Sequence, residues 1–295
     1  MVQARDGYIP FMGFKTYYKI VGKPRKNKLP LLVLHGGPGG AHNYLLGLQA
    51  LSNKRQVIFY DQLGCGLSDH PEDNSLWTIQ LFIDELKTVR KELGLNTIHL
   101  LGHSWGGMLA IDYLLTQPEG VHSAVLASTM ISMPLYQEEV DKLKQALPAN
   151  VYAALTKHEK AGTTDASLYK WAYNEYQKQH LFRGGEFPPE LSIPQESVGD
   201  ASYKKMWGAS EAYADGTMKN WDRIKKLHEI TIPTLITSGQ YDELTPWQAS
   251  ITRDNIPNSQ LKIFTNGSHL VHIEQPEEYV HELEKFIEGT EAGIQ

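Results

Sequence analysis

The chain has 295 residues, of which 41% are hydrophobic and 21% charged, so it can bury a sizeable core and is not intrinsically disordered. Its 28 Lys and Arg against 34 Asp and Glu give a net charge of −6 without any basic stripe, which argues against nucleic acid as a partner. The single cysteine, Cys65, the absence of a secretion signal at the N-terminus and the shortness of all apolar runs predict a cytoplasmic protein that does not insert into a membrane.

Six short β-rich runs lie along the chain, at residues 31–34, 57–60, 98–101, 124–127, 234–237 and 261–264. Several are followed by a glycine turn and a segment with helical spacing, which is typical of a mostly parallel α/β sheet. The last run alternates in polarity, so we expect it near an edge of the sheet. Between the second and third runs, apolar residues recur every three or four positions from Ile79 to Leu93. This spacing predicts a surface helix with Ser75 as its N-cap and Gly94 just beyond its end.

Residues 131–222 have a different pattern, with apolar residues at helical spacing, many Tyr and Trp, and no clear buried strand. We interpret this segment as a helical cap domain inserted between two core strands. Such a cap would lie over the carboxyl ends of the strands, where open α/β sheets hold their sites. The predicted division is therefore a core of residues 1–130 and 223–295 and a cap of residues 131–222.

A Gly-x-Ser-x-Gly motif at residues 102–106 follows the third run and precedes a segment that can be helical. In that context the serine stands on a sharp strand-to-helix turn with its hydroxyl exposed, so Ser104 is the predicted nucleophile. The backbone N–H of Trp105 and the positive end of the following helix face the place where an oxyanion would form. The alternative is a chance occurrence of the motif in an ordinary loop.

A glycine-rich loop with the sequence HGGPGG at residues 35–40 ends the first run. Glycines at this position let a backbone N–H approach a substrate oxygen, and Gly37 is the best candidate for a first oxyanion donor beside Trp105. A nucleotide-binding loop is the alternative interpretation. The Gly-x-Gly-x-x-Gly spacing is absent, however, and no acidic residue is placed to bind a ribose.

An acid and a base must follow the serine in the chain order serine, acid, histidine. Asp242 follows the fifth run and His269 follows the last, so both are expected at the carboxyl edge of the sheet. His269 would take the Ser104 proton and return it to the leaving group, while Asp242 would fix the tautomer of the imidazole. His272 is a rival base. A metal site built on the two histidines would need further ligands, and we expect none.

Five motifs together span the chain, at residues 35–40, 60–68, 102–107, 239–246 and 267–269. With them the sequence resembles the proline iminopeptidases (prolyl aminopeptidases) of the α/β-hydrolase fold, including the tricorn-interacting aminopeptidases. The Asp-Gln-x-Gly-x-Gly-x-Ser run at residues 61–68 is the most specific of these motifs. The resemblance implies a serine exopeptidase that releases an N-terminal residue, often proline, from short peptides without a metal or cofactor.

An aminopeptidase must bind the free α-ammonium group of its substrate, and carboxylates near the nucleophile are a simple way to do so. The resemblance implies that Glu211 in the cap and Glu243 beside the acid form this pair. Alternatively, Glu211 is a solvated cap residue and Glu243 caps the helix that begins near Pro246. Cys65 is similar to a cysteine found in this loop in the family, and we expect a packed thiol outside the chemistry.

Two other functions compete with the exopeptidase. An esterase, lactonase or amino-acid amidase could use the same serine, acid and histidine, because the fold sets the chemistry and the cap sets the substrate. A catalytically inactive binding scaffold would be expected to lack one of the three residues, all of which are present here. The cap aromatics Trp207, Tyr213 and Trp221 are candidate walls for a proline ring. The oligomeric state is left open.

Overall fold

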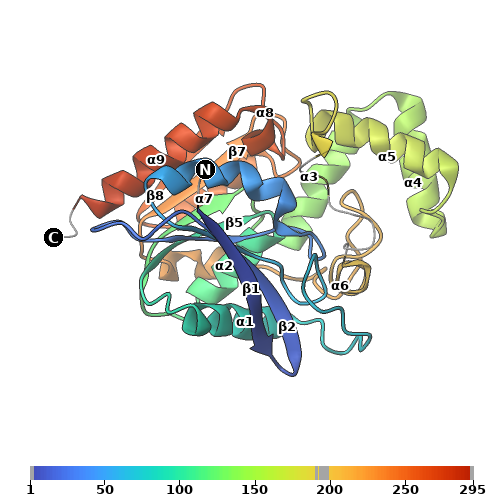
Figure 1. Cartoon of the computed structure of the whole chain (residues 1–295). Helices are drawn as coiled ribbons and strands as arrows, with labels where there is room; N and C mark the ends of the chain where they lie inside the picture. The colour runs from blue at the N-terminus through green and yellow to red at the C-terminus, as the bar shows by residue number, and fades with distance from the viewer. Residues whose placement is uncertain (1–2, 190–191, 193–198, 293–295) are drawn as a thin grey trace.

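A single β-sheet crosses the middle of the molecule (Figure 1). The structure is a computed structural model and describes residues 3–189, 192 and 199–292. Within these residues the sheet has eight strands in the order β1-β2-β4-β3-β5-β6-β7-β8. The strands are β1 (Ala4–Phe11), β2 (Phe14–Val21), β3 (Leu31–Leu34), β4 (Val57–Tyr60), β5 (Ile98–His103), β6 (Val121–Ala127), β7 (Thr234–Gly239) and β8 (Ser259–Phe264).

The six strands from β3 to β8 run parallel, and they confirm all six predicted strands. β8 lies at one edge of the sheet, as its alternating pattern predicts. The sequence prediction does not include the antiparallel hairpin of β1 and β2, which forms the opposite edge. This hairpin turns at Met12 and Gly13, which have φ angles of +51° and +85°.

Helices cover both faces of the sheet, which is why its central strands are apolar throughout. In β3, Leu32 and Leu34 belong to the same buried cluster as α1 and α2, whereas Leu31 and Val33 pack in the cluster of η1 and α9. The helices around the sheet are η1 (His42–Asn53), α1 (Ile79–Glu92), α2 (Trp105–Leu114), η4 (Ile224–Glu229), α7 (Pro246–Asn255), α8 (Val271–Glu274) and α9 (Pro276–Glu291).

Helix α1 confirms the predicted helix but corrects its start. The side chain of Thr78, not that of Ser75, caps α1 by accepting a hydrogen bond from the Leu81 amide at 3.2 Å. The backbone N–H of Ser75 instead donates to the Asp73 side chain in the preceding turn. Two capping residues three positions apart offer the same local chemistry, and the tertiary packing of Leu81 selects one of them. Gly94 lies just past the helix with a φ of +65°, as predicted.

In its described residues, the segment between β6 and β7 contains four α-helices before η4, and these four lie together beside the sheet (Figure 1). They are α3 (Met133–Gln145), α4 (Ala149–Ala161), α5 (Ser167–His180) and α6 (Asp200–Met206). Backbone hydrogen bonds join the two ends of this segment, from Arg223 N to Ile131 O at 2.8 Å and from Met133 N to Trp221 O at 2.8 Å. The helical insertion is therefore closed at its base. Its treatment as a separate domain with boundaries at 131 and 222 stays a prediction.

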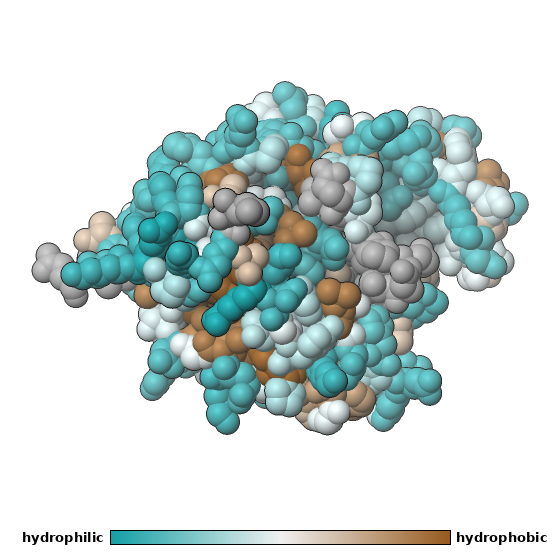
Figure 2. Space-filling model, in the orientation of Figure 1, coloured by the Kyte–Doolittle hydropathy of each residue, from teal (hydrophilic) through white to brown (hydrophobic). Residues whose placement is uncertain are grey.

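The surface is mostly polar on the face that Figure 2 shows. Large apolar side chains that remain exposed, such as Tyr8 and Met12 on the N-terminal hairpin, are few among the described residues. None of the helices in the described ranges combines the length and the apolarity needed to cross a membrane.

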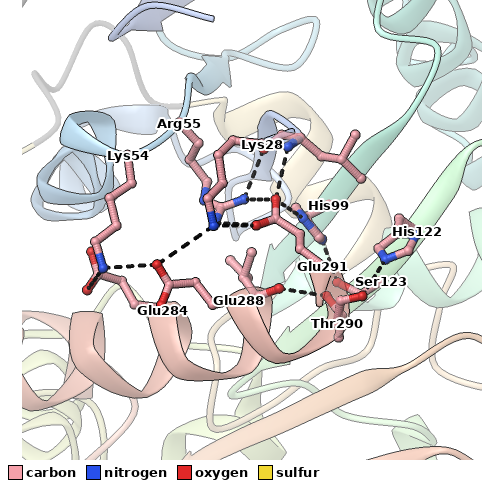
Figure 3. A network of polar contacts seen from close by, with 12 residues as sticks. Lys28, Lys54, Arg55, His99, His122, Ser123, Glu284, Glu288, Thr290 and Glu291 are labelled. Carbon is pink, nitrogen blue, oxygen red and sulfur yellow. Dashed lines mark hydrogen bonds and ion pairs between the residues drawn. The ribbon is translucent and has the colours of Figure 1, made fainter. Parts of the chain in front are cut away.

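A buried network of charges fastens the end of α9 to the amino-terminal end of the sheet (Figure 3). Glu291 receives two hydrogen bonds from Arg55, at 2.6 and 3.2 Å, one from Lys28 at 2.9 Å and one from the Leu29 amide at 2.9 Å. Burial alone would raise the pKa of Glu291, but these donors lower it to about 2. The carboxylate is therefore ionised throughout the neutral range.

The same network contains a second serine–histidine–carboxylate sequence. Ser123 Oγ lies 2.7 Å from His99 Nδ1, and His99 Nε2 lies 3.2 Å from Glu291. Because a carboxylate can only accept, His99 carries its proton on Nε2 and accepts from Ser123. Ser123 and His99 are 0% exposed, so no substrate reaches them. This triad-like set is structural.

Replacing Glu291 with alanine should lower the free energy of unfolding at pH 7 by about 3 to 5 kcal/mol, because it leaves the guanidinium of Arg55, which is 1% exposed, without a counter-ion. Glu291 has a lowered pKa in the folded state, so its contribution is complete above its ordinary pKa and is lost as the pH falls towards 2. Urea denaturation at several pH values measures both effects.

Glu288→Ala on the same helix is the matched control, because the side chain of Glu288 is 40% exposed and pairs with the exposed Lys54. It should cost much less than Glu291→Ala. Equal losses for the two variants would contradict the assignment of Glu291 as the main fastening residue of α9.

Candidate active site

Ser104 stands at the turn between β5 and α2 in a strained backbone conformation. Its φ and ψ are +56° and −124°, a region that side chains other than glycine rarely occupy. A hydrogen bond from Ser104 N to Ala127 O, 2.9 Å long, fixes this turn against the end of β6. Strain at a residue is sustained only when the surroundings determine it, and this turn places Ser104 in the wall of a pocket.

Glycines on both sides of Ser104 are required by the packing of the turn. A Cβ on Gly102 would collide with the backbone of Gly106, and a Cβ on Gly106 would collide with the carbonyl of Leu34. The structure therefore supports the steric reason for the Gly-x-Ser-x-Gly pattern. Close approach of α2 to β3 brings the amino end of the helix beside the glycine loop.

His269 and Asp242 meet at the carboxyl edge of the sheet. His269 Nδ1 lies 2.9 Å from Asp242 Oδ1, and the same oxygen accepts the Leu244 amide at 2.9 Å. Because the carboxylate accepts, the neutral form of His269 carries its proton on Nδ1 and has Nε2 as its basic nitrogen. Burial alone would lower the pKa of His269, but the charge and hydrogen bond of Asp242, with Glu243 and Glu211 nearby, raise it to about 9.

The rival base His272 does not contact Asp242. Its Nε2 lies 3.2 Å from the carbonyl oxygen of Tyr44 and is therefore a donor. Burial lowers the pKa of His272 to about 3, which keeps the ring neutral. Of the two histidines, the structure joins only His269 to the acid that the sequence predicts.

The two predicted oxyanion donors lie on neighbouring elements. Gly37 has a φ of +119° in the glycine loop, and Trp105 is the first residue of α2. In the described ranges, neither backbone N–H donates to a protein acceptor. Two free N–H groups near a helix terminus form a suitable environment for a developing negative charge.

Gln62 connects the glycine loop to Trp105. Its side-chain nitrogen donates to the carbonyl of His35 at 3.0 Å, and its side-chain oxygen accepts the indole N–H of Trp105 at 2.8 Å. The backbone N–H of Gln62 also donates to His35 Nε2 at 2.9 Å. The sequence pattern by itself gives no role to Gln62, although this residue lies in the most specific motif. Through Gln62, that motif forms a hydrogen-bonded brace between the glycine loop of Gly37 and the side chain of Trp105, the two candidate oxyanion donors.

A pocket of about 450 Å³ opens beside these groups. Ser104, His269, Gly37 and Glu211 all contribute to its wall. The apolar part of the wall includes Leu181, Phe187 and Leu270, which sequence analysis did not identify. The aromatics expected as walls are placed otherwise: Trp207 and Trp221 are buried in the core, and the described lining residues do not include Tyr213. Helical spacing alone does not distinguish a core aromatic from a pocket aromatic.

Glu211 and Glu243 lie close to His269 from two different parts of the chain. Glu211 Oε1 accepts the hydroxyl of Tyr203 at 3.0 Å, and Glu243 Oε2 accepts that of Tyr176 at 3.1 Å. In the part of the chain that the structure describes, no Lys or Arg pairs with either carboxylate. Burial raises the pKa of both, and the proximity of Glu211 raises that of Glu243 further.

These positions argue against the two alternative interpretations of the glutamates, a solvated Glu211 and a helix-capping Glu243. Glu243 is fully buried, so it is not a solvated residue, and Thr245 rather than Glu243 caps α7 by accepting the Gln248 amide. Glu211 lines the pocket and is not freely solvated. Tyr176 and Tyr203 are polar neighbours that sequence analysis did not predict, since a tyrosine at helical spacing gives no signal of its hydroxyl contact.

Cys65 is 0% exposed, and its thiol lies near Gly39 of the glycine loop. Burial raises the pKa of its thiol well above the ordinary value, so it stays protonated. A protonated, inaccessible thiol reacts slowly. The described residues also contain no group of three His, Cys, Asp or Glu side chains placed to hold a metal ion.

Comparison with known proteins gives both a fold and close relatives. A family model described as the alpha/beta hydrolase fold matches residues 30–276. A proline iminopeptidase from Clostridium botulinum is 41% identical over 285 residues, which cover 96% of this chain and 97% of that protein. A second, from Lactobacillus acidophilus, is 39% identical over 97% of this chain and 99% of its own length.

Two solved structures are similar over nearly the whole chain. The proline iminopeptidase of Mycobacterium smegmatis superposes with a TM-score of 0.91 at 35% identity, covering 99% of this chain and all of its own. VinJ superposes with a TM-score of 0.93 at 33% identity, covering 97% of this chain and 99% of its own. The Mycobacterium smegmatis structure therefore carries the same name as the two sequence relatives.

Proposed function

This chain belongs to the proline iminopeptidase family of α/β-hydrolases, and from that premise we propose that it is a serine exopeptidase that releases an N-terminal residue, preferentially proline, from short peptides. Its substrates are peptides with a free N-terminus, and it works in the cytoplasm without a metal or cofactor. The observation that carries the proposal is the pair of carboxylates beside His269, the buried Glu243 and the pocket-lining Glu211, neither of which pairs with a Lys or Arg among the described residues.

In the proposed reaction, Ser104 Oγ attacks the carbonyl carbon of the first residue while His269 Nε2 takes the hydroxyl proton. Asp242 holds the Nδ1 proton of His269 and stabilises the imidazolium that forms. The 2.9 Å contact between these two side chains supports the assignment. The imidazolium then gives its proton to the leaving amine, which leaves an acyl-enzyme on Ser104.

Water hydrolyses the acyl-enzyme with His269 again as the base. In both steps the carbonyl oxygen becomes negative and receives hydrogen bonds from the backbone N–H groups of Gly37 and Trp105. That these N–H groups have no acceptor in the described part of the protein supports this role. The brace made by Gln62 keeps the two donors at a fixed separation.

Glu211 and Glu243 bind the substrate α-ammonium in this proposal. Two neighbouring buried carboxylates repel each other, so a cation between them removes an unfavourable interaction and gains hydrogen bonds. The same carboxylates raise the pKa of His269, and a bound ammonium opposes that effect. Binding of the correct substrate therefore favours the neutral imidazole that the reaction needs.

Changing either Glu211 or Glu243 to glutamine should lower kcat/KM for a prolyl amide by about 10- to 150-fold, because a desolvated carboxylate–ammonium contact is worth roughly 1.5 to 3 kcal/mol. A neutral ester lacks the ammonium and should lose little. Hydrolysis of aminoacyl chromogenic amides, each with and without an N-acetyl group, provides the measurement. N-acetylation should be at least as harmful as either substitution.

Glu138→Gln is a suitable control because Glu138 is an exposed glutamate of the same cap. It should leave both activities within about twofold of the wild type. Equal losses on amide and neutral ester in the Glu211 and Glu243 variants, or cleavage of N-acetylated substrates as fast as free ones, would favour the esterase over the exopeptidase.

A further inference from the structure

A chain of three hydrogen bonds connects the glycine loop to the backbone of His269. Gly36 N lies 2.7 Å from the hydroxyl oxygen of Tyr44, and that oxygen lies 2.9 Å from His103 Nδ1. His103 Nε2 in turn lies 3.1 Å from the carbonyl oxygen of His269. Tyr44 and His103 also line the pocket, although neither has a role in the reaction described above.

The proton positions along this chain follow from its two ends. The backbone N–H of Gly36 can only donate, so the hydroxyl oxygen of Tyr44 accepts and its own hydrogen is directed to His103 Nδ1. The carbonyl of His269 can only accept, so His103 Nε2 carries a proton. Both requirements select the same neutral tautomer of His103. Burial and the neighbouring His272 and His269 rings lower the pKa of His103 well below its ordinary value, which agrees with a neutral ring.

Both ends of this hydrogen-bonded chain adjoin groups that take part in the proposed reaction. Gly36 directly precedes Gly37, whose N–H is an oxyanion donor in the proposed reaction. A Cβ on Gly36 would lie 2.8 Å from the Tyr44 hydroxyl and 3.1 Å from Ser104 Cβ, so the loop packs closely against both residues. His269 is fixed from the other side as well, because its N–H donates to the carbonyl of His180 at 3.1 Å.

We propose that Tyr44 and His103 are positioning residues that hold the Gly37 oxyanion donor and the base His269 in register with Ser104. The proposal rests on the serine chemistry of the proposed function but not on its amine specificity. His103 is well suited to this role because it directly precedes the nucleophile in β5. The imidazole of His103 is thus connected to the glycine loop through Tyr44 and to His269 through its carbonyl, while its backbone is bonded directly to Ser104.

The first test is Tyr44→Phe, which removes the bonds to Gly36 and His103 while keeping the ring. Displacement of a reacting group by about 1 Å can cost about 100-fold in rate, so kcat should fall by about 10- to 100-fold with KM within about threefold of the wild type. Tyr279→Phe is the matched control: Tyr279 is another buried tyrosine, whose hydroxyl contacts Thr237 at 3.1 Å, and its loss should leave kcat unchanged.

His103 variants separate the two ends of the chain. Asparagine places an oxygen near the position of Nδ1 and keeps the contact with Tyr44, whereas glutamine places an N–H near Nε2 and keeps the contact with His269. Each should lose part of the rate and be faster than His103→Ala. When His103→Ala is added to Tyr44→Phe, kcat should fall by less than about a further threefold, because the hydrogen-bonded chain acts as a unit.

Three readouts make the result independent of substrate specificity: a prolyl amide, a neutral p-nitrophenyl ester and the labelling rate of Ser104 by a fluorophosphonate. Parallel losses on all three, with thermal stability near that of the wild type, support the proposal. A Tyr44→Phe enzyme within twofold of the wild-type kcat, a loss confined to KM, or additive effects of the two positions would overturn it. If Tyr44→Phe does not fold, the ordering of the three His103 variants decides. A wild-type enzyme that cleaves the ester but not the amide would refute the exopeptidase alone.

Discussion

Ser104→Ala is expected to lower kcat by at least about 10⁴-fold on every substrate, because the serine, histidine and acid act as a unit and the remaining rate comes from binding and the oxyanion donors alone. The fold should persist. Alanine keeps the Cβ of Ser104, and loss of Oγ removes no side-chain hydrogen bond that fixes the turn among the described residues. Steady-state kinetics and thermal unfolding measure the two expectations.

Ser123→Ala is the control for this result. Ser123 is a buried serine whose hydroxyl contacts an imidazole, that of His99, but it lies in the network at the opposite end of the sheet. Its loss should change stability and leave kcat near the wild-type value. A folded Ser104→Ala enzyme that keeps its activity would show that another residue attacks the substrate.

Asp242→Asn is expected to lower kcat by about 10³- to 10⁴-fold, because an amide can donate to His269 Nδ1 and so favour the tautomer with its proton on Nε2. That proton would occupy the position where the base must accept from Ser104. The change also removes the negative charge that raises the pKa of His269. The acidic limb of the kcat–pH profile should therefore move to lower pH.

The kcat–pH profile of the Asp242→Asn enzyme provides the check, measured on the neutral ester as well as the prolyl amide. Losses should be equal on the two substrates, in contrast to the Glu243→Gln enzyme, in which only the amide should suffer. A near-wild-type rate in Asp242→Asn would mean that a different residue orients His269.

Much of the fold follows from local patterns in the sequence. The runs that become β3 to β8 are apolar because both faces of the sheet are covered, and the alternating pattern of the last run marks the edge strand. Gly102 and Gly106 are needed because any side chain there would collide with the backbone. Patterns of this kind are visible in a sequence because each depends on a few neighbouring residues.

Only part of the candidate site can be predicted from such local patterns. Ser104, Asp242 and His269 each follow a recognisable strand, so parallel strands must bring them to one edge, and the structure joins the latter two at 2.9 Å. Their catalytic roles remain predictions. Glu211 and Glu243 were assigned by resemblance, because nothing in their local sequence indicates burial without a cation.

The sequence by itself determined the α/β architecture, the strained turn at Ser104 and the order of the candidate catalytic residues. Only the tertiary structure decided which polar side chains support them. Tyr44 meets His103 across 59 residues, Gln62 meets Trp105 across 43, and Arg55 meets Glu291 across 236. Such contacts depend on how whole elements pack, and a hydroxyl or amide that is buried against a distant partner has the same local sequence pattern as one that faces water.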